Sequence, residues 1–234
     1  MKFRYDLGGG QSTVRSVMVH TGGTNALKVG AAVKVGGAYA VVAAASSLAD
    51  VKGVLQAGDP ATPDSSLSTP IDLRAKVLIN PLAVFLAEYD QTSTLTATSS
   101  SGATVTIANL VAVAGDWVYV VSGTGIGQLI YVATGGTGSF TASVAPSPAL
   151  DGTSTVIHVL GQDTEGIGLT ADGTKLATTA AAPTGAGRVV GNFISAPSLS
   201  EIELDPVLHG GITVPNAHLL SEIIFTDHAY NVSA

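Results

Sequence analysis

The sequence predicts an all-β protein: a discontinuous β-barrel or sandwich domain, an inserted β-meander domain, an extended N-terminal arm and a C-terminal tail. Along most of the 234 residues, short runs of β-branched and aromatic residues are separated by glycine-containing turns, as in strands joined by hairpins. The 28 glycines, with many Thr, Ser, Ala and Val residues, favour strands and turns over helices. The length is ample to bury a core.

Residues 1–27 are predicted to form the arm. Phe3 and Tyr5 precede a triple glycine, and the only apolar run, at residues 17–19, is short. A segment of this kind has no core of its own and is ordered only against another surface, with a frayed terminus as the alternative. Four cations against one acid give residues 1–28 a net charge of +3.

The first β domain is predicted over residues 28–90 and 161–199. The Gly36-Gly37 pair indicates a hairpin between its first two strands. For residues 81–89 we favour a strand over a single helical turn. After the insert, a hairpin around residues 171–174 is expected. The other predicted strands span residues 29–35, 39–44, 51–57, 71–79 and 188–194.

Residues 91–160 form the predicted inserted domain, because they contain no Lys or Arg and only two acids, Asp116 and Asp151. A Ser- and Thr-rich stretch at residues 91–101 marks the boundary with the first domain. We expect a β-meander of about four strands. Its predicted strands are the apolar runs at residues 117–121, 129–133, 139–144 and 153–160.

The glycine-rich loop at residues 123–127 does not fit a phosphate-binding loop. It lacks the dinucleotide-binding spacing and a Lys-Ser/Thr pair, and a strand follows it where an anion-binding loop needs a helix N-terminus. We expect its glycines to supply the positive φ angles of a hairpin turn.

One sequence pattern in the insert resembles a known module. The pattern GDWVYVVSGTGIGQ from residue 115, then a polar hairpin, then ALDGTSTVI from residue 149 is similar to a β-module in virion structural proteins of tailed bacteriophages. The similarity covers under a fifth of the chain and indicates a virion context more than one role within the particle.

The tail, residues 200–234, is acidic and apolar. It has no Lys or Arg, and its five acids give a net charge of −5. Its apolar residues, which include Leu208 and Ile212, are too many for a disordered segment, so we expect the tail to dock. The opposite charges of the two ends suit either a head-to-tail contact between subunits or docking within one chain. The acids are Glu201, Glu203, Asp205, Glu222 and Asp227.

The composition restricts the possible partners. Charged residues make up 12% of the chain, about half the usual quarter, which suggests that other subunits cover much of the exterior. The net charge of −7 argues against nucleic acid as a partner. No stretch of about twenty apolar residues exists, so no membrane partner is expected. The first residues lack the apolar core of a signal peptide, and the absence of Cys excludes disulfides and Cys-based zinc sites.

The residues that carry chemistry form no recognisable catalytic, metal or cofactor site, and we predict that the chain is not an enzyme. No histidine pair has the HExxH spacing; His209 and His218, near Asp205, are the least improbable metal pair. His158 alternates with apolar neighbours in a predicted strand and is expected at the surface or an interface. No nucleophile motif is present. The acid pairs at residues 163/165 and 201/203 are interpreted as solvated.

The chain also resembles capsid decoration (cement) proteins of tailed phages, with an arm, a β-rich body and the virion module. The resemblance implies a homotrimer at three-fold positions on the outer capsid surface, where it binds the major capsid protein and stabilises the head. The chain is short for a major capsid protein and lacks that fold's long helix. The alternative is a tail-associated or receptor- or glycan-binding virion module, which needs an exposed aromatic platform.

Eight residues are predicted at the capsid or oligomer interface. Three belong to arm docking, and two pack in the core or between subunits. The set comprises Phe3, Arg4 and Tyr5 in the arm, Trp117 and Tyr119 in the module, and Arg15, Leu208 and Ile212.

Overall fold

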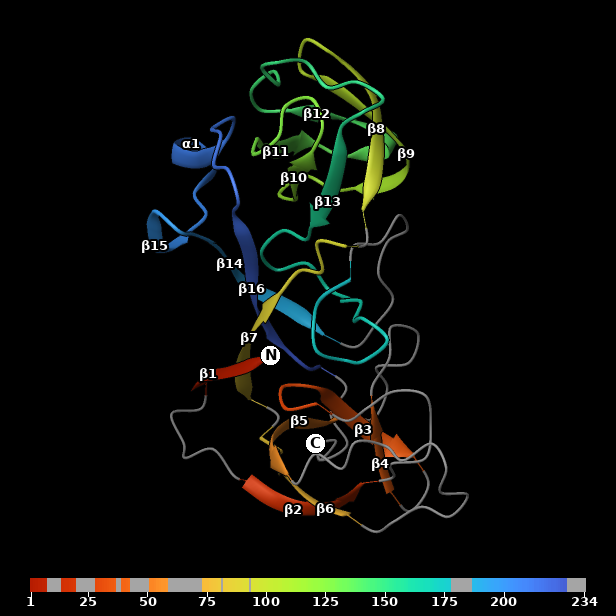
Figure 1. Ribbon diagram of the computed structural model, residues 1–234, viewed down its shortest axis with the longest axis vertical. Coiled ribbons are helices and arrows are strands. Elements are labelled where there is room, and N and C mark those ends of the chain that lie inside the picture. Colours follow the sequence, from red (N-terminus) through yellow and green to blue (C-terminus); the bar gives the residue numbers. More distant parts are fainter. Residues whose placement is uncertain are drawn as a thin grey trace.

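Strands dominate the computed structural model of this chain (Figure 1), so the protein is all-β as predicted. Among the described residues the one helix, α1 (Pro206–His209), has four residues, and no helix there is long and apolar enough to cross a membrane. The structure describes residues 1–7, 14–19, 28–36, 39–42, 51–58, 73–80, 82–92, 94–177 and 187–226.

The sixteen strands of this part form two closed barrels and one open sheet, which follow one another along the long axis in Figure 1. The small barrel has the order β2-β4-β3-β5-β6. Its hairpin β3–β4 joins at Gly36↔Tyr39, as the glycine pair predicts. Its strands are β2 (Val14–Val19), β3 (Ala32–Gly36), β4 (Tyr39–Val42), β5 (Val51–Gly58) and β6 (Leu73–Leu78).

The open sheet lies in the middle of Figure 1 and has the order β1-β7-β16-β14-β15, with every neighbouring pair antiparallel. The predicted strand at residues 81–89 is confirmed as β7. The sheet ends in two edge strands, β1 and β15. Its strands are β1 (Lys2–Asp6), β7 (Ala83–Glu88), β14 (Arg188–Ala196), β15 (Leu199–Glu203) and β16 (His218–Ile224).

The second barrel lies at the top of Figure 1, with the order β10-β11-β12-β9-β8-β13. The prediction of a simple meander is wrong in its last step, because β12 pairs with β9 and β13 returns between β10 and β8. That return closes the sheet and removes its edges. Its strands are β8 (Leu95–Ser101), β9 (Thr104–Ala112), β10 (Trp117–Ser122), β11 (Leu129–Thr134), β12 (Gly136–Ala142) and β13 (Thr155–Val159).

The two predicted terminal segments differ from the structure. Within the predicted arm, residues 1–27, β1 pairs with β7 and β2 pairs with β6, so both strands are part of this chain's own sheets. Within the predicted tail, residues 200–234, β16 is the central strand of the open sheet. These strands therefore pair within the chain, with β1 paired on one side only. The tail residues 227–234, with Asp227, lie outside the described residues.

One hydrophobic core joins the three sheets. It contains Phe85 and Ile223 from the open sheet, Val54 and Leu78 from the small barrel, and Trp117 from the second barrel. A separate core fills the inside of the second barrel. Along β10, Trp117 and Tyr119 face the shared core, whereas Val118 and Val120 face the barrel interior, as the two-residue period of a strand requires.

The glycine loop of the second barrel has the predicted geometry. Gly123, Gly125 and Gly127 have φ angles of +79°, +82° and +85°, which L residues with a side chain adopt reluctantly. A Cβ on Gly123 would also lie 2.0 Å from the carbonyl oxygen of Thr153. The loop is therefore a tight turn against its own barrel.

Candidate interaction surface

The edge strand β15 and the turn that follows it form the most exposed apolar and acidic surface of the described chain. We call residues 199–209 the β15–α1 projection, which lies at the left of Figure 1. On α1, the side chains of Val207 and Leu208 are 90% and 68% exposed. On β15 all residues except Ile202 are exposed. Val207 and Leu208 are neighbours in the chain, so they form one exposed apolar tip.

The turn is ordered by local hydrogen bonds, since four residues are too few for a stable isolated helix. The Asp205 carboxylate caps α1 by accepting from the Val207 N–H at 2.7 Å. The Asp205 N–H donates to His209 Nδ1 at 2.9 Å. Both flanks are anchored to the body, because the Leu204 N–H donates to the Asn192 carbonyl and the Gly211 N–H to that of Leu129. The exposed tip is therefore held rigidly.

A groove of about 510 Å³ lies beside the projection, and a second of about 190 Å³ continues under it. The two share Gln162, Glu203, Leu204 and Pro206. The floor includes Trp117 and Tyr131 of the second barrel, whose rings pack edge to face with centroids 5.1 Å apart. The lining of the groove is thus mixed, with apolar residues beside the polar Gln162 and the acids Glu203 and Asp205.

The opposite edge of the sheet, β1, carries the cations. Lys2 and Arg4 lie two residues apart on β1, and both side chains are exposed. Arg4 reaches across the sheet: its guanidinium bonds to Glu201, approaches Glu222 to 2.8 Å, and lies 5.0 Å from the centroid of the Phe193 ring. Burial opposes its charge, but the two carboxylates outweigh burial and raise the pKa of Arg4.

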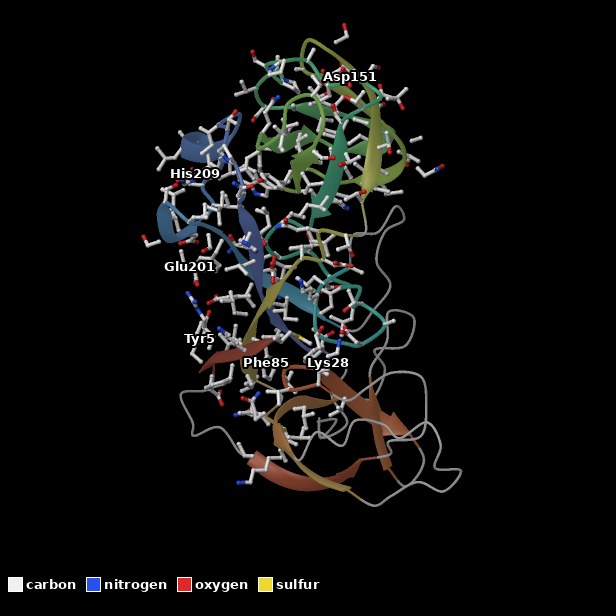
Figure 2. The ribbon with its side chains drawn as sticks, in the orientation of Figure 1. Tyr5, Lys28, Phe85, Asp151, Glu201 and His209 are labelled. Carbon is white, nitrogen blue, oxygen red and sulfur yellow. The ribbon has the colours of Figure 1, made fainter. Side chains whose placement is uncertain are left out.

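The Tyr5 hydroxyl completes this cluster by donating to Glu222 Oε2 at 2.8 Å. Burial and the bond to Glu222 raise the pKa of Tyr5. In Figure 2, Tyr5, Glu201 and His209 follow one another along the left side of the molecule. The arm residues Arg4 and Tyr5 are therefore bound within their own chain, and their docking on another subunit stays a prediction.

The remaining predicted interface residues fall into four groups. Trp117 and Tyr119 are buried in the shared core, so their packing is internal. Phe3 and Ile212 are partly buried against the same core. Leu208 is exposed, as an interface residue must be. Arg15 lies on β2, and its side chain is outside the described part.

The prediction that His158 lies at the surface or an interface is wrong. Its side chain is 2% exposed, and Nε2 lies 2.7 Å from Oδ2 of Asp116, which is 1% exposed. The Asp116 carboxylate also accepts the N–H groups of Val113 at 2.9 Å and Gly161 at 2.7 Å. Among the described atoms, His158 Nδ1 is a buried nitrogen with no partner. Asp116 and His158 lie where β10 begins and β13 ends. Their contact therefore joins these two strands at the place where the chain leaves the barrel.

The two histidines of the predicted metal pair have separate partners. His209 bonds to the backbone of Asp205, whereas His218 Nδ1 lies 2.6 Å from Glu88 Oε1. In the part of the chain that the structure describes, no group of three His, Asp or Glu side chains is placed to hold a metal ion. In each of the acid pairs 163/165 and 201/203, one acid has its own cationic partner: Asp163 binds Arg188, and Glu201 binds Arg4.

Sequence reasoning missed the contrast between the two sheet edges. The signal was present as alternation: cations at residues 2 and 4, and acids at residues 201, 203 and 205. It could be interpreted only once the sheet order placed these strands at opposite edges. Comparison with protein-family models, with curated proteins and with solved structures gives no match to the chain.

Proposed function

We propose that this chain is a structural protein of a tailed-phage virion. It binds the outer surface of the capsid as a homotrimer at three-fold positions and stabilises the head by linking adjacent subunits of the major capsid protein. The observation that carries the proposal is the rigid β15–α1 projection with Val207 and Leu208 exposed. An apolar tip held by hydrogen bonds at both flanks loses little conformational entropy on binding, which favours a permanent contact.

The body behind the tip supports a mechanical role. The three sheets share one hydrophobic core, and the second barrel is joined to the segment that follows the projection by the bond from the Leu129 N–H to the Ile212 carbonyl, at 2.9 Å. A rigid body with several contact points can link neighbouring subunits, and linked contacts raise avidity by roughly 10² to 10⁴ without one strong site. The polar pair inside the body, Asp116 and His158, is buried and we assign it a structural rather than a catalytic role.

The alternative, a tail-associated or receptor- or glycan-binding module, is less well supported. A glycan platform needs exposed aromatic rings, whereas Trp117, Tyr119 and Phe85 are buried. Among the described side chains, Tyr5 is the most exposed large aromatic, at 40%, and its hydroxyl is bonded to Glu222.

The copy number per virion tests the proposed role. Quantitative mass spectrometry of virions that contain the chain should give hundreds of copies, in a fixed ratio to the major capsid protein. Cryo-EM should show matching density at three-fold positions outside the shell. A few dozen copies or fewer, or density on the tail, would contradict the proposal in favour of the tail-associated module.

The tip can be tested separately with matched variants. Val207→Asp places a charge in the proposed contact and should weaken binding of the purified protein to chain-free shells by about tenfold or more. Val29→Asp is the control, because Val29 is also exposed, at 59%, but lies outside the projection. Equal binding by both variants would remove the tip from the contact.

A further inference from the structure

The two edges of the open sheet are opposite in charge and equal in spacing. On β1 the exposed cations Lys2 and Arg4 are two residues apart, and on β15 the exposed acids Glu201 and Glu203 are also two residues apart. Side chains two apart on a strand lie on one face. β1 thus begins with two cations and ends with the acid Asp6, whereas the only charged residues of β15 are its two acids.

Each edge strand is paired on one side only within the described chain. β1 pairs with β7 and β15 pairs with β14. An edge strand of five residues presents unpaired N–H and C=O groups that can accept a further strand. The barrels have no such edges, because both are closed.

The charges decide which strand each edge accepts. Two β15 strands side by side would place acids against acids, and two β1 strands would place cations against cations; like charges directly opposite destabilise a pair of strands. Only β1 against β15 brings opposite charges together. The Arg4–Glu201 pair within the chain shows that these side chains bind one another.

We propose that β15 of one copy pairs with β1 of the next, so that the open sheet continues from subunit to subunit. The contact is heterologous, and such contacts close into a ring when the rotation between subunits allows it. In the all-antiparallel sheet β1 and β15 run in the same direction, so a continued sheet pairs them in parallel. This inference deepens the proposed function, since it rests on the self-association proposed there and names the surfaces that form it.

Two residues remain available for the contact between copies. Arg4 and Glu201 are bound within the chain, whereas neither Lys2 nor Glu203 forms an ion pair among the described side chains. We expect the parallel strands to be offset by two residues, so that Lys2 of one copy lies diagonally from Glu203 of the next and Asp6 lies beyond the end of β15.

Charge exchange tests this pairing on the full chain. Glu203→Lys and Lys2→Glu should each weaken self-association by about tenfold. The double variant K2E/E203K should restore association to within about threefold of the original, because opposite charges face each other again. Sedimentation velocity over a concentration series gives the dissociation constants, and far-UV circular dichroism checks that each variant is folded.

Glu165→Lys is the matched control, because Glu165 is exposed, lies outside both edge strands and undergoes the same charge change. Its association should be unchanged. The proposal is overturned if the unmodified chain stays monomeric up to about 100 μM, if the single variants behave like the control, or if the double variant is not restored. Loss of association in Val207→Asp alone would place the self-contact on α1 instead.

The virion experiment separates this inference from the proposed function. A chain that is monomeric in solution but present in hundreds of copies on the shell retains the capsid role and loses the edge pairing. A chain that self-associates through Lys2 and Glu203 but is absent from the shell retains the pairing and loses the capsid role.

Discussion

The second barrel and the open sheet differ in how their strands end and in where their charges lie. The six strands of the barrel, β8 to β13, contain no Asp, Glu, Lys or Arg, whereas the five strands of the sheet contain eight such residues. The barrel is closed, so its backbone groups are paired around the ring; the sheet is open and has two edges. Charge and unpaired backbone thus occur together, in the part of the molecule for which we propose self-association.

The closed barrel and the open sheet suit different tasks. A closed, uncharged barrel with its own core contributes stability and shape. An open sheet with charged edges retains the capacity to pair, and its charges limit the partners it accepts.

Truncating the barrel residue that reaches the sheet should have the largest effect. Trp117 is buried in the shared core and packs on Tyr131, so Trp117→Ala should lower the free energy of unfolding by about 3–5 kcal/mol. Urea denaturation followed by circular dichroism measures it. We expect a single transition, because this core joins barrel and sheet. Two separated transitions would show that the regions unfold independently.

Removing the buried carboxylate should loosen the barrel where the chain leaves it. Asp116→Ala leaves the N–H groups of Val113 and Gly161, and His158 Nε2, without their acceptor. The expected loss is about 3 kcal/mol, because each buried unsatisfied group costs about 1–3 kcal/mol and the site partly relaxes. Denaturation measures the loss. Asp151→Ala is the control: it removes the barrel's other acid, whose partners are exposed, and should cost clearly less.

Removing one hydroxyl should weaken the attachment of the segment after α1 to the barrel. The Tyr119 hydroxyl donates to the Val214 carbonyl at 3.1 Å and accepts from the Ala217 N–H at 3.0 Å. Tyr119→Phe should cost about 1–2 kcal/mol and should speed hydrogen exchange at the Ala217 amide. Unchanged exchange there, measured by NMR, would show that the bond contributes little.

The smallest effect is expected at the hairpin beside the small barrel, and it depends on pH. Asp172 is partly desolvated, but hydrogen bonds from Lys28, Thr174 and Thr170 outweigh that and hold the pKa of its carboxyl well below its ordinary value. A depressed folded pKa adds stability above the unfolded pKa, and this stability is lost as the pH falls through the folded value. Asp172→Asn should therefore cost about 1 kcal/mol at neutral pH and progressively less below about pH 4.

Thermal unfolding across a pH series measures this difference. Asp163→Asn is the comparison, because the Asp163–Arg188 pair is exposed and should contribute less than about 0.5 kcal/mol. A loss at Asp172 that stays constant down to acid pH would contradict the assignment to its ionised form.

Individual strands could be predicted well from the sequence, because the β-branched and aromatic residues that favour a strand lie within that strand. The runs at residues 51–57, 117–121 and 188–194 correspond to β5, β10 and β14. The sequence did not predict partners across the barrel. The pairing of β13 with β10 and β8, rather than with β12, depends on closure of the whole ring, which no local pattern encodes.

The error at His158 has a specific physical reason. Alternation identifies an inside and an outside face only when one face of a strand is solvated. β13 is buried on both faces: Ile157 and Val159 face the shared core, and Val156 faces the barrel interior. His158, the polar residue among these apolar neighbours, therefore points into the barrel. For the arm residues Arg4 and Tyr5, the sequence indicated docking but could not distinguish the chain's own sheet from a neighbour's.

Because β8 and β13 are neighbours, the second barrel can be exchanged as a unit in protein engineering and in evolution. The chain passes into the second barrel at Leu95 and leaves it at Val159, and the two strands are paired through Val156↔Leu95. A module whose two connections lie side by side can be exchanged for another without redirecting the rest of the polypeptide. A replacement module must supply apolar side chains that fill the shared core as three residues of the barrel do. These residues are Trp117, Leu129 and Ile157.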